Sequence, residues 1–258
     1  MIGIDAMPSD TSTLPDIDKT AAAQIVSDGY AIVRNLLPEP DLDPVRQAAA
    51  RALTAQRRYE AKVNAEDNFG SRRVRELLGN DETYWACAAH PVMLAIAERV
   101  LGPGFHIGAA ALNEVSPGAR AQRLHRDDEF VSLPRPFSRT FVMNSIWALT
   151  DFTTEAGATR FVTGSHRETR AMAEDEVIHA EMGRGSVFIF DGSLWHGSSR
   201  NNSTSEIRIG LVVTYCAAFV RPFENQLRGF SHKKLAAIPA DRARLMSPAL
   251  DAKIAAKR

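Results

Sequence analysis

The chain of 258 residues has the composition of a globular protein, with 45% hydrophobic and 24% charged residues. Its 31 basic residues balance 31 acidic ones, and this zero formal charge excludes the broad positive field of a general nucleic-acid or anionic-membrane binder. The longest apolar run, 211–220, is too short to span a membrane, and the N-terminus lacks the basic and apolar regions of a secretory signal. The two cysteines are too few for a disulfide framework and fit a reducing compartment. We therefore expect one cytoplasmic domain over residues 1–258, with neither nucleic acid nor membrane as its partner.

The N-terminal hundred residues predict mostly helices. Residues 1–15 are polar and contain prolines, so we expect them to be flexible. Asp18 is placed to cap the first helix. The dense charge of residues 57–80 shows no period, which predicts irregular structure. The regular elements expected in this part are, in chain order, a helix over 20–27, a strand over 30–33, a helix over 45–56 and a helix over 91–101.

From residue 105 onward, short apolar runs alternate with turn signals. This texture is typical of a sandwich or barrel of short strands. The tail over 231–258 is charged and predicts a surface helix. The strands expected in this part are 106–115, 140–149, 159–163, 186–190 and 207–220.

Three histidines stand two residues before a carboxylate, at His125, His166 and His179. If the segment from His125 to Asp127 is extended, the imidazole and the carboxylate share one face of the strand. Two such ligands and a third from a distant segment would form the 2-His-1-carboxylate set of non-heme Fe(II) oxygenases. Three matches in one chain make the pattern weak by itself, and a surface pair explains it equally well.

The downstream sequence favours the pair at His125. A buried strand and a tight turn at Asp191-Gly192 would bring His196 back toward the sandwich. Arg208 heads the most apolar strand, on a face of small residues, which indicates space for an anion because a guanidinium binds a carboxylate with two parallel hydrogen bonds. The alternative is an arginine at the rim that pairs with Glu206.

In combination, these segments resemble the phytanoyl-CoA dioxygenase-like (PhyH-like) branch of the Fe(II)/2-oxoglutarate oxygenases. The similarity runs from Asp28 to about Gln226, and within the branch the motifs are most similar to the enzymes that oxidise fungal secondary metabolites, the meroterpenoids and alkaloids. The joint occurrence of the motifs in the right order makes the signal strong. The segments that carry it are, in order, 117–128, 147–153, 157–161, 164–166, 196–198 and Arg208.

The resemblance implies a role for seven residues. Gln122 lies an odd number of residues from His125, so a bend or bulge must turn it toward the same site. By the resemblance, iron would be held by His125, Asp127 and His196. The distal carboxylate of 2-oxoglutarate would be bound by Arg208 with help from Thr159. The cosubstrate would also contact Gln122 near the metal and Trp147 in the pocket wall.

The fold that the resemblance implies is mainly β with flanking α, a double-stranded β-helix (jelly roll) whose N-terminal helices pack on one sheet. The implied function is oxidation of an unactivated C–H bond of a small organic molecule, a secondary metabolite, with Fe(II) as metal, 2-oxoglutarate and dioxygen as cosubstrates, and succinate and CO2 as by-products. The carboxylate of Asp127 occupies the position that halogenating relatives leave open, which disfavours halogenation.

Several alternatives are left open by the sequence. The substrate could be a small acid or a coenzyme A thioester, for which Arg72, Arg73 and Arg75 form a local basic cluster. The chain could be a non-catalytic jelly-roll binding protein, or a zinc hydrolase with the same three ligands. A homodimer is also open. We expect the substrate side of the pocket to come from residues 57–80, 128–137 and 221–225.

Overall fold

Two sheets form the core of the protein in the computed structural model, which describes residues 4–5, 14–63, 70–170, 172, 174–225 and 227–246. The larger sheet has the strand order β1-β2-β8-β5-β10-β4-β3, and the smaller has the order β7-β6-β9. All pairs are antiparallel except β1 with β2. The strands are β1 (Ile4–Asp5), β2 (Tyr30–Arg34), β3 (Ser71–Val74), β4 (His106–Val115), β5 (Val142–Ala148), β6 (Thr159–Phe161), β7 (Ile178–His179), β8 (Val187–Asp191), β9 (His196–Ser198) and β10 (Arg208–Cys216).

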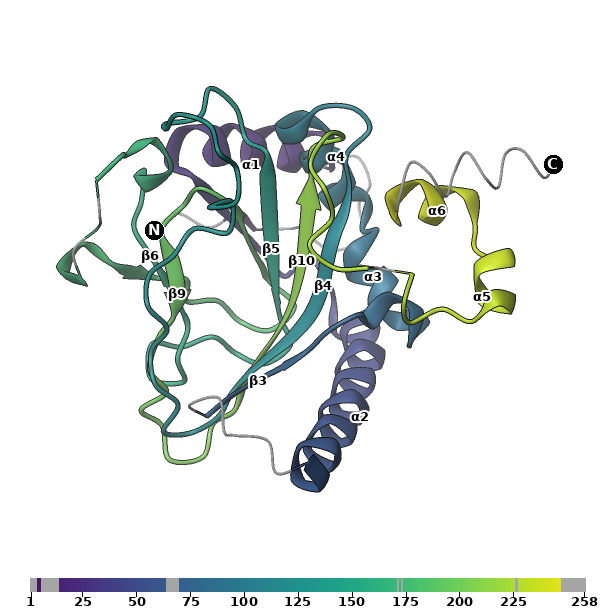
Figure 1. Ribbon diagram of the computed structural model, residues 1–258. Coiled ribbons are helices and arrows are strands. Elements are labelled where there is room, and N and C mark those ends of the chain that lie inside the picture. Colours follow the sequence, from purple (N-terminus) through teal and green to yellow (C-terminus); the bar gives the residue numbers. More distant parts are fainter. Residues whose placement is uncertain are drawn as a thin grey trace.

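The helices lie on one side of the larger sheet and the smaller sheet lies on the other (Figure 1). This is the mainly antiparallel, jelly-roll arrangement with flanking helices that the sequence predicts. The helices are α1 (Leu14–Asp28), α2 (Glu39–Val63), α3 (Trp85–Ala88), α4 (Pro91–Leu101), α5 (His232–Ala236) and α6 (Ala240–Met246). Short 3-10 turns are η1 (Leu77–Gly79), η2 (Glu82–Tyr84), η3 (Ser165–Arg167) and η4 (Glu174–Glu176).

Alternation of side chains along the central strands gives each face of the larger sheet its own core. On β10, Leu211, Val213 and Tyr215 pack with the helices. Val212, on the other face, packs with aromatic side chains such as Phe152 between the two sheets. The second face also carries polar residues of the candidate site, so the space between the sheets is where a ligand can enter.

Helix α1 begins earlier than the sequence predicts, at Leu14. Pro15 is tolerated there because the N–H groups of a first turn have no helical partner. Asp18 is therefore not a cap: it lies within the helix, is buried and pairs with Arg99 of α4 at 2.5 Å. The ion pair joins α1 to α4, which Figure 1 shows side by side.

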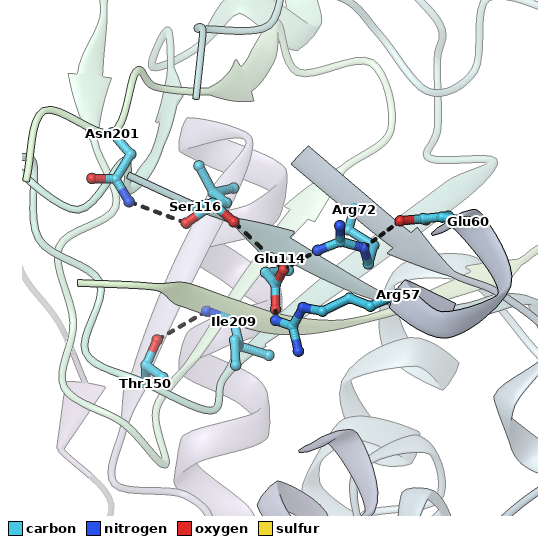
Figure 2. A network of polar contacts seen from close by, with 9 residues as sticks. Arg57, Glu60, Arg72, Glu114, Ser116, Thr150, Asn201 and Ile209 are labelled. Carbon is cyan, nitrogen blue, oxygen red and sulfur yellow. Dashed lines mark hydrogen bonds and ion pairs between the residues drawn. The ribbon is translucent and has the colours of Figure 1, made fainter. Parts of the chain in front are cut away.

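The prediction of irregular structure over residues 57–80 is wrong for most of its described part, and residues 64–69 lie outside the described residues. Helix α2 continues to Val63, and residues 71–74 form the edge strand β3. Ion pairs stabilise both elements, because Arg57 of α2 and Arg72 of β3 bind the two oxygens of the buried Glu114 of β4. Arg72 also binds Glu60 of α2 at 2.7 Å. Figure 2 shows this Glu114 cluster, which consists of Arg57, Glu60, Arg72 and Glu114.

Both ends of the chain differ from their predictions where they are described. Residues 1–3, 6–13 and 247–258 lie outside the described residues, whereas Ile4–Asp5 pairs with β2. In place of one surface helix, residues 232–246 form the short helices α5 and α6. Helix α6 buries Leu245 and Met246 in the core, so it is not a purely surface element. No described helix has the length and apolar character needed to cross a membrane.

Candidate metal and cosubstrate site

Three side chains from two separate segments converge on a cavity of about 450 Å³ between the sheets: His125 and Asp127 from one, and His196 from the other. The turn after β8 returns the chain so that the backbones of His125 and His196 exchange hydrogen bonds of 2.9 and 3.0 Å. Their ligand atoms lie within 4.8 Å of one another. Asp127 Oδ1 is 3.6 Å from His125 Nε2, and Asp127 Oδ2 is 3.4 Å from His196 Nε2. Within the described part of the chain, His166 and His179 belong to no comparable cluster.

Both imidazoles are oriented by hydrogen bonds on the side away from Asp127. His125 Nδ1 is 3.0 Å from the carbonyl oxygen of Arg123, and His196 Nδ1 is 2.9 Å from that of Leu194. A carbonyl oxygen only accepts, so each Nδ1 is the protonated nitrogen. Nε2 of each ring then carries the lone pair and faces the cavity, which is the tautomer that metal ligation by Nε2 requires.

Asp127 is positioned by a chain of hydrogen bonds through the larger sheet. Asn144 Nδ2 of β5 donates to Asp127 Oδ2 at 2.9 Å, and Thr214 of β10 donates to Asn144 Oδ1 at 2.7 Å. Burial alone would raise the pKa of Asp127, but the neighbouring His196 and His125 hold that pKa below its ordinary value. The carboxylate is therefore ionised and fixed in direction, as a metal ligand must be.

The two histidines differ in their own electrostatics. Burial, followed by the proximity of His196, lowers the pKa of His125. Burial also opposes the charged form of His196, but Asp127 outweighs it and raises the pKa of His196. The donor set of two imidazoles and one carboxylate, clustered on one side of a cavity, fits a divalent transition metal with open coordination positions.

Arg208 is a buried cation whose charge no described carboxylate balances. It is 3% exposed, and it forms no ion pair with Glu206 or another acid of the described chain, which excludes the rim alternative there. Burial lowers its pKa to about 10. Its Nη2 donates to Thr159 Oγ1 at 2.6 Å, while its Nε has no partner. A buried guanidinium with unused donors indicates a site for an anionic ligand.

The position of Arg208 is fixed by its surroundings. Its guanidinium lies 4.2 Å from the centre of the Phe152 ring. Gly210, the next residue on this face, leaves room for that ring, because a Cβ there would lie 3.0 Å from Phe152. The adjoining N–H of Ile209 donates to Thr150 Oγ1 at 2.9 Å, which anchors the start of β10 (Figure 2).

Gln122 reaches the same cavity from an irregular segment. Its Oε1 accepts a hydrogen bond of 3.0 Å from the N–H of Ser198, and its own N–H donates to the carbonyl oxygen of Ser198. No regular strand joins Gln122 to His125, which resolves the parity problem that the sequence poses. In all, six of the seven predicted site residues line one cavity: Gln122, His125, Asp127, Thr159, His196 and Arg208.

Trp147, the seventh residue, does not lie in this cavity. It is 1% exposed and packs among the helix-side core residues, with its ring 5.5 Å from that of His90. Its neighbour Ile146 lines the cavity. Successive residues of a strand face opposite sides, so Trp147 of β5 must point away from the site. The prediction that it contacts the cosubstrate is wrong.

Three polar residues at or beside the cavity have no role predicted from the sequence. Asn144 supports Asp127, and Asn113 and Ser198 line the same cavity. Asn144 and Asn113 each follow apolar residues within a mostly apolar strand, which is a signal that the sequence offers. Ser198 belongs to the segment 196–198 that carries the resemblance, but its residue type alone indicates no role. The segments expected on the substrate side do contribute, through Ser71, Phe130 and Phe223 among others.

The fold and the site define a jelly-roll protein with a 2-His-1-carboxylate group that could hold a metal ion. The sequence profile of the phytanoyl-CoA dioxygenase (PhyH) family matches residues 25–210. The chain therefore belongs to the PhyH family, and its assignment as a dioxygenase is confirmed.

Similar proteins agree with this membership. Dioxygenase olcK from Penicillium canescens is 32% identical over 221 residues, which cover 78% of this chain and 70% of olcK. Dioxygenase trt7 from Aspergillus terreus is 30% identical over 221 residues, 81% of this chain and 77% of trt7. The crystal structure of the epimerase SnoN in complex with Fe3+, alpha-ketoglutarate and nogalamycin RO superposes with a TM-score of 0.61 at 19% identity, covering 81% of this chain and 88% of SnoN. The last similarity concerns the fold.

Proposed function

We propose that this chain is an Fe(II)- and 2-oxoglutarate-dependent dioxygenase that oxidises an unactivated C–H bond of a small organic molecule, a secondary metabolite. The observation that carries the proposal is the single cavity that joins the His125, Asp127 and His196 cluster to the unbalanced charge of Arg208. We place the activity in a single cytoplasmic domain. The solved relative SnoN was crystallised with nogalamycin RO, which supports a small-molecule substrate.

Iron would be held by Nε2 of His125, Nε2 of His196 and a carboxylate oxygen of Asp127. These three donors come from one side of the cavity and leave the other side for ligands that change during the reaction. When iron, 2-oxoglutarate and dioxygen are bound, they supply the oxidant for the C–H bond, and 2-oxoglutarate leaves as succinate and CO2.

The distal carboxylate of 2-oxoglutarate would be bound by Arg208 and Thr159. The Thr159 hydroxyl accepts from Arg208 at 2.6 Å, so its own proton is free to donate to the same carboxylate. Gln122 and Ser198, which bond each other at the metal side, would contact the cosubstrate there. With both ends held, 2-oxoglutarate has one orientation relative to the three metal ligands.

Other residues of the site would orient the metal ligands and exclude water from the reacting groups. Asn144 keeps one oxygen of Asp127 directed toward the histidines, and the aromatic ring of Phe190 lies 4.5 Å from that of His196. Such apolar walls exclude water from the reacting groups and strengthen the electrostatic contacts of the site. Asp127 fills the third ligand position with a carboxylate, so a halide has no place at the metal and the proposal is oxidation rather than halogenation.

Two alternative functions, a zinc hydrolase and a non-catalytic binding protein, explain the site less well. A zinc hydrolase has no use for a buried arginine beside its metal, and a binding protein has no need of three oriented metal ligands. The decisive experiment supplies the purified protein with Fe(II) and 2-oxoglutarate and measures succinate, with and without dioxygen, in the presence of extracts that contain candidate substrates. Succinate that depends on both iron and dioxygen supports the proposal. Succinate at the same level without dioxygen, or none under any condition, would contradict it.

A further inference from the structure

Among the arginines that line the cavity, Arg73 and Arg208 have no acidic partner in the described part of the chain, and the proposed function assigns only Arg208 to the cosubstrate. Glu114 is bound by Arg57 and Arg72, and Glu224 is bound by Arg75 at 3.0 Å. Arg73 also lines the cavity, yet its side chain forms no hydrogen bond or ion pair with the residues that the structure describes. Its charge is thus left for a ligand.

The strand that carries Arg73 is held in place by its neighbours. On β3, Arg72 lies opposite Glu114 of β4, and Arg73 lies opposite Asn113. The two arginines therefore point to opposite faces of the sheet: Arg72 toward the Glu114 cluster and α2 (Figure 2), and Arg73 into the cavity beside the Asn113 amide. The Glu114 cluster fixes the strand, and the strand directs a free guanidinium inward.

The surroundings of Arg73 make its charge costly in the absence of a ligand. It retains access to solvent, but partial burial lowers its pKa, and the nearby charge of Arg75 lowers it further. The negative charges of Glu224 and Asp127 raise the pKa of Arg73, but neither carboxylate forms an ion pair with it. An incoming carboxylate would accept two parallel hydrogen bonds from the guanidinium and would replace the lost hydration.

When Fe(II) and 2-oxoglutarate are bound as proposed, neither of them needs the positive charge of Arg73. In the proposed function, two negative charges of 2-oxoglutarate and one of Asp127 meet two positive charges of Fe(II) and one of Arg208, which sums to zero. Arg73 remains as a single positive charge, and a single charge matches a carboxylate rather than the several negative charges of a phosphate-rich ligand such as a coenzyme A thioester.

The same opening carries apolar surface. Phe130 and Phe223 both line the cavity and are 51% and 39% exposed. Their rings pack edge to face with centroids 5.0 Å apart. Exposed aromatic side chains beside a cavity are suited to contact an apolar framework.

We propose that the substrate is a carboxylic acid with an apolar framework, whose carboxylate is bound by Arg73 and Asn113 and whose framework contacts Phe130 and Phe223. This inference rests on the proposed function, because it assigns Arg208 to the cosubstrate and so leaves Arg73 to the substrate. It makes Arg73 a residue that determines substrate specificity.

The test uses the protein loaded with Fe(II) and 2-oxoglutarate in the absence of dioxygen, so that ligands bind without turnover. The probes are a panel of aromatic and alicyclic carboxylic acids, each paired with its methyl ester, and binding is measured by equilibrium dialysis. We expect the acids to bind the wild type about tenfold or more tightly than their esters, since a charge-assisted hydrogen bond contributes about one to two decades of affinity. Arg73→Gln should bring the ratio close to one, and Arg73→Lys should give an intermediate ratio.

The control is Arg58→Gln, which removes an exposed arginine of α2 outside this cavity and should leave the ratio unchanged. Equal binding of acids and esters to the loaded wild type, or binding of neither, overturns the inference alone. A loss of 2-oxoglutarate affinity of tenfold or more in Arg73→Gln also overturns it, because Arg73 would then serve the cosubstrate. Failure of the wild type to bind 2-oxoglutarate would instead contradict the proposed function.

Discussion

The floor of the cavity and its mouth are built in opposite ways. At the floor, which consists of His125, Asp127, His196 and Arg208, each side chain is fixed by a hydrogen bond to a carbonyl, an amide or a hydroxyl group. At the mouth, which consists of Arg73, Phe130 and Phe223, the side chains retain solvent exposure. Side chains that are held by supporting hydrogen bonds bind a ligand in one geometry, as metal and cosubstrate require.

The difference teaches where specificity resides in this protein. The proposed function assigns the residues of the floor to the metal and to 2-oxoglutarate, which every turnover would require. The mouth combines a cation that pairs with no acid of the described residues with two exposed rings, and the further inference assigns these side chains to the substrate. The following predictions test whether changes at the two places have separate effects.

The largest effect is expected from loss of a metal ligand at the floor. His125→Ala or His196→Ala should each abolish binding of about one Fe(II) per chain, because two remaining ligands hold a labile ferrous ion poorly. Metal analysis of the purified variants after dialysis measures this. Arg73→Gln, at the mouth, is the control and should retain its iron. Unchanged iron content in both histidine variants would refute the ligand assignment.

A large effect on stability is expected from the Glu114 cluster, which supports the mouth from behind. Glu114→Gln removes the one fully buried carboxylate between Arg57 and Arg72. Breaking one partner of a buried ion pair costs up to 3–5 kcal/mol, and the partial exposure of both arginines reduces the expected loss to about 2–3 kcal/mol of unfolding free energy. Urea denaturation measures it.

The matched control for this prediction is the exposed pair of Arg170 with Glu176. Glu176→Gln should change the unfolding free energy by less than about 1 kcal/mol. A loss in Glu114→Gln no larger than in this control would show that β3 is held by other contacts.

The next effect separates the two cavity arginines. Arg208→Lys should keep iron but raise the 2-oxoglutarate concentration needed for half-maximal binding by about one to two decades, because an ammonium cannot reproduce the two-pronged contact with a carboxylate. Calorimetric titration of the Fe(II) protein under anaerobic conditions measures it. Arg73→Lys should leave this concentration unchanged. Equal cosubstrate affinity in wild type and Arg208→Lys would mean that Arg208 has a structural role.

The sequence predicts the residues of the floor well, but it does not predict the direction of every side chain. His125, Asp127, His196 and Arg208 are detectable because their chemistry requires particular residue types in a particular order. Trp147 was misplaced because one residue of register moves a side chain to the opposite face of a strand, and a motif match does not specify the face.

The structure of residues 57–80 could not be predicted for a different reason. Strand β3 has the sequence Ser-Arg-Arg-Val, which has no apolar alternation, and it forms because Glu114 of β4 binds Arg72. That partner lies 42 residues away along the chain, so no local pattern reveals it. The role that we propose for Arg73 depends on the acidic partners of Arg72 and Arg75, which are distant along the chain and which no local pattern reveals.

The smallest effect is expected when an aromatic ring that supports the floor is removed, and a ring at the mouth serves for comparison. Phe152→Leu removes the ring that lies 4.2 Å from the Arg208 guanidinium. A cation–π contact contributes about 0.5–2 kcal/mol, and without it the guanidinium is held less firmly for its ligand, so we expect 2-oxoglutarate to bind about two- to tenfold more weakly. Phe223→Leu should leave 2-oxoglutarate binding unchanged, since this ring lies beside Phe130 at the mouth. The same anaerobic titration measures both variants, and a thermal melt of each confirms that the fold is retained. If both leucine variants weaken 2-oxoglutarate binding equally, the floor and the mouth are coupled, and the separation of cosubstrate and substrate contacts would have to be abandoned.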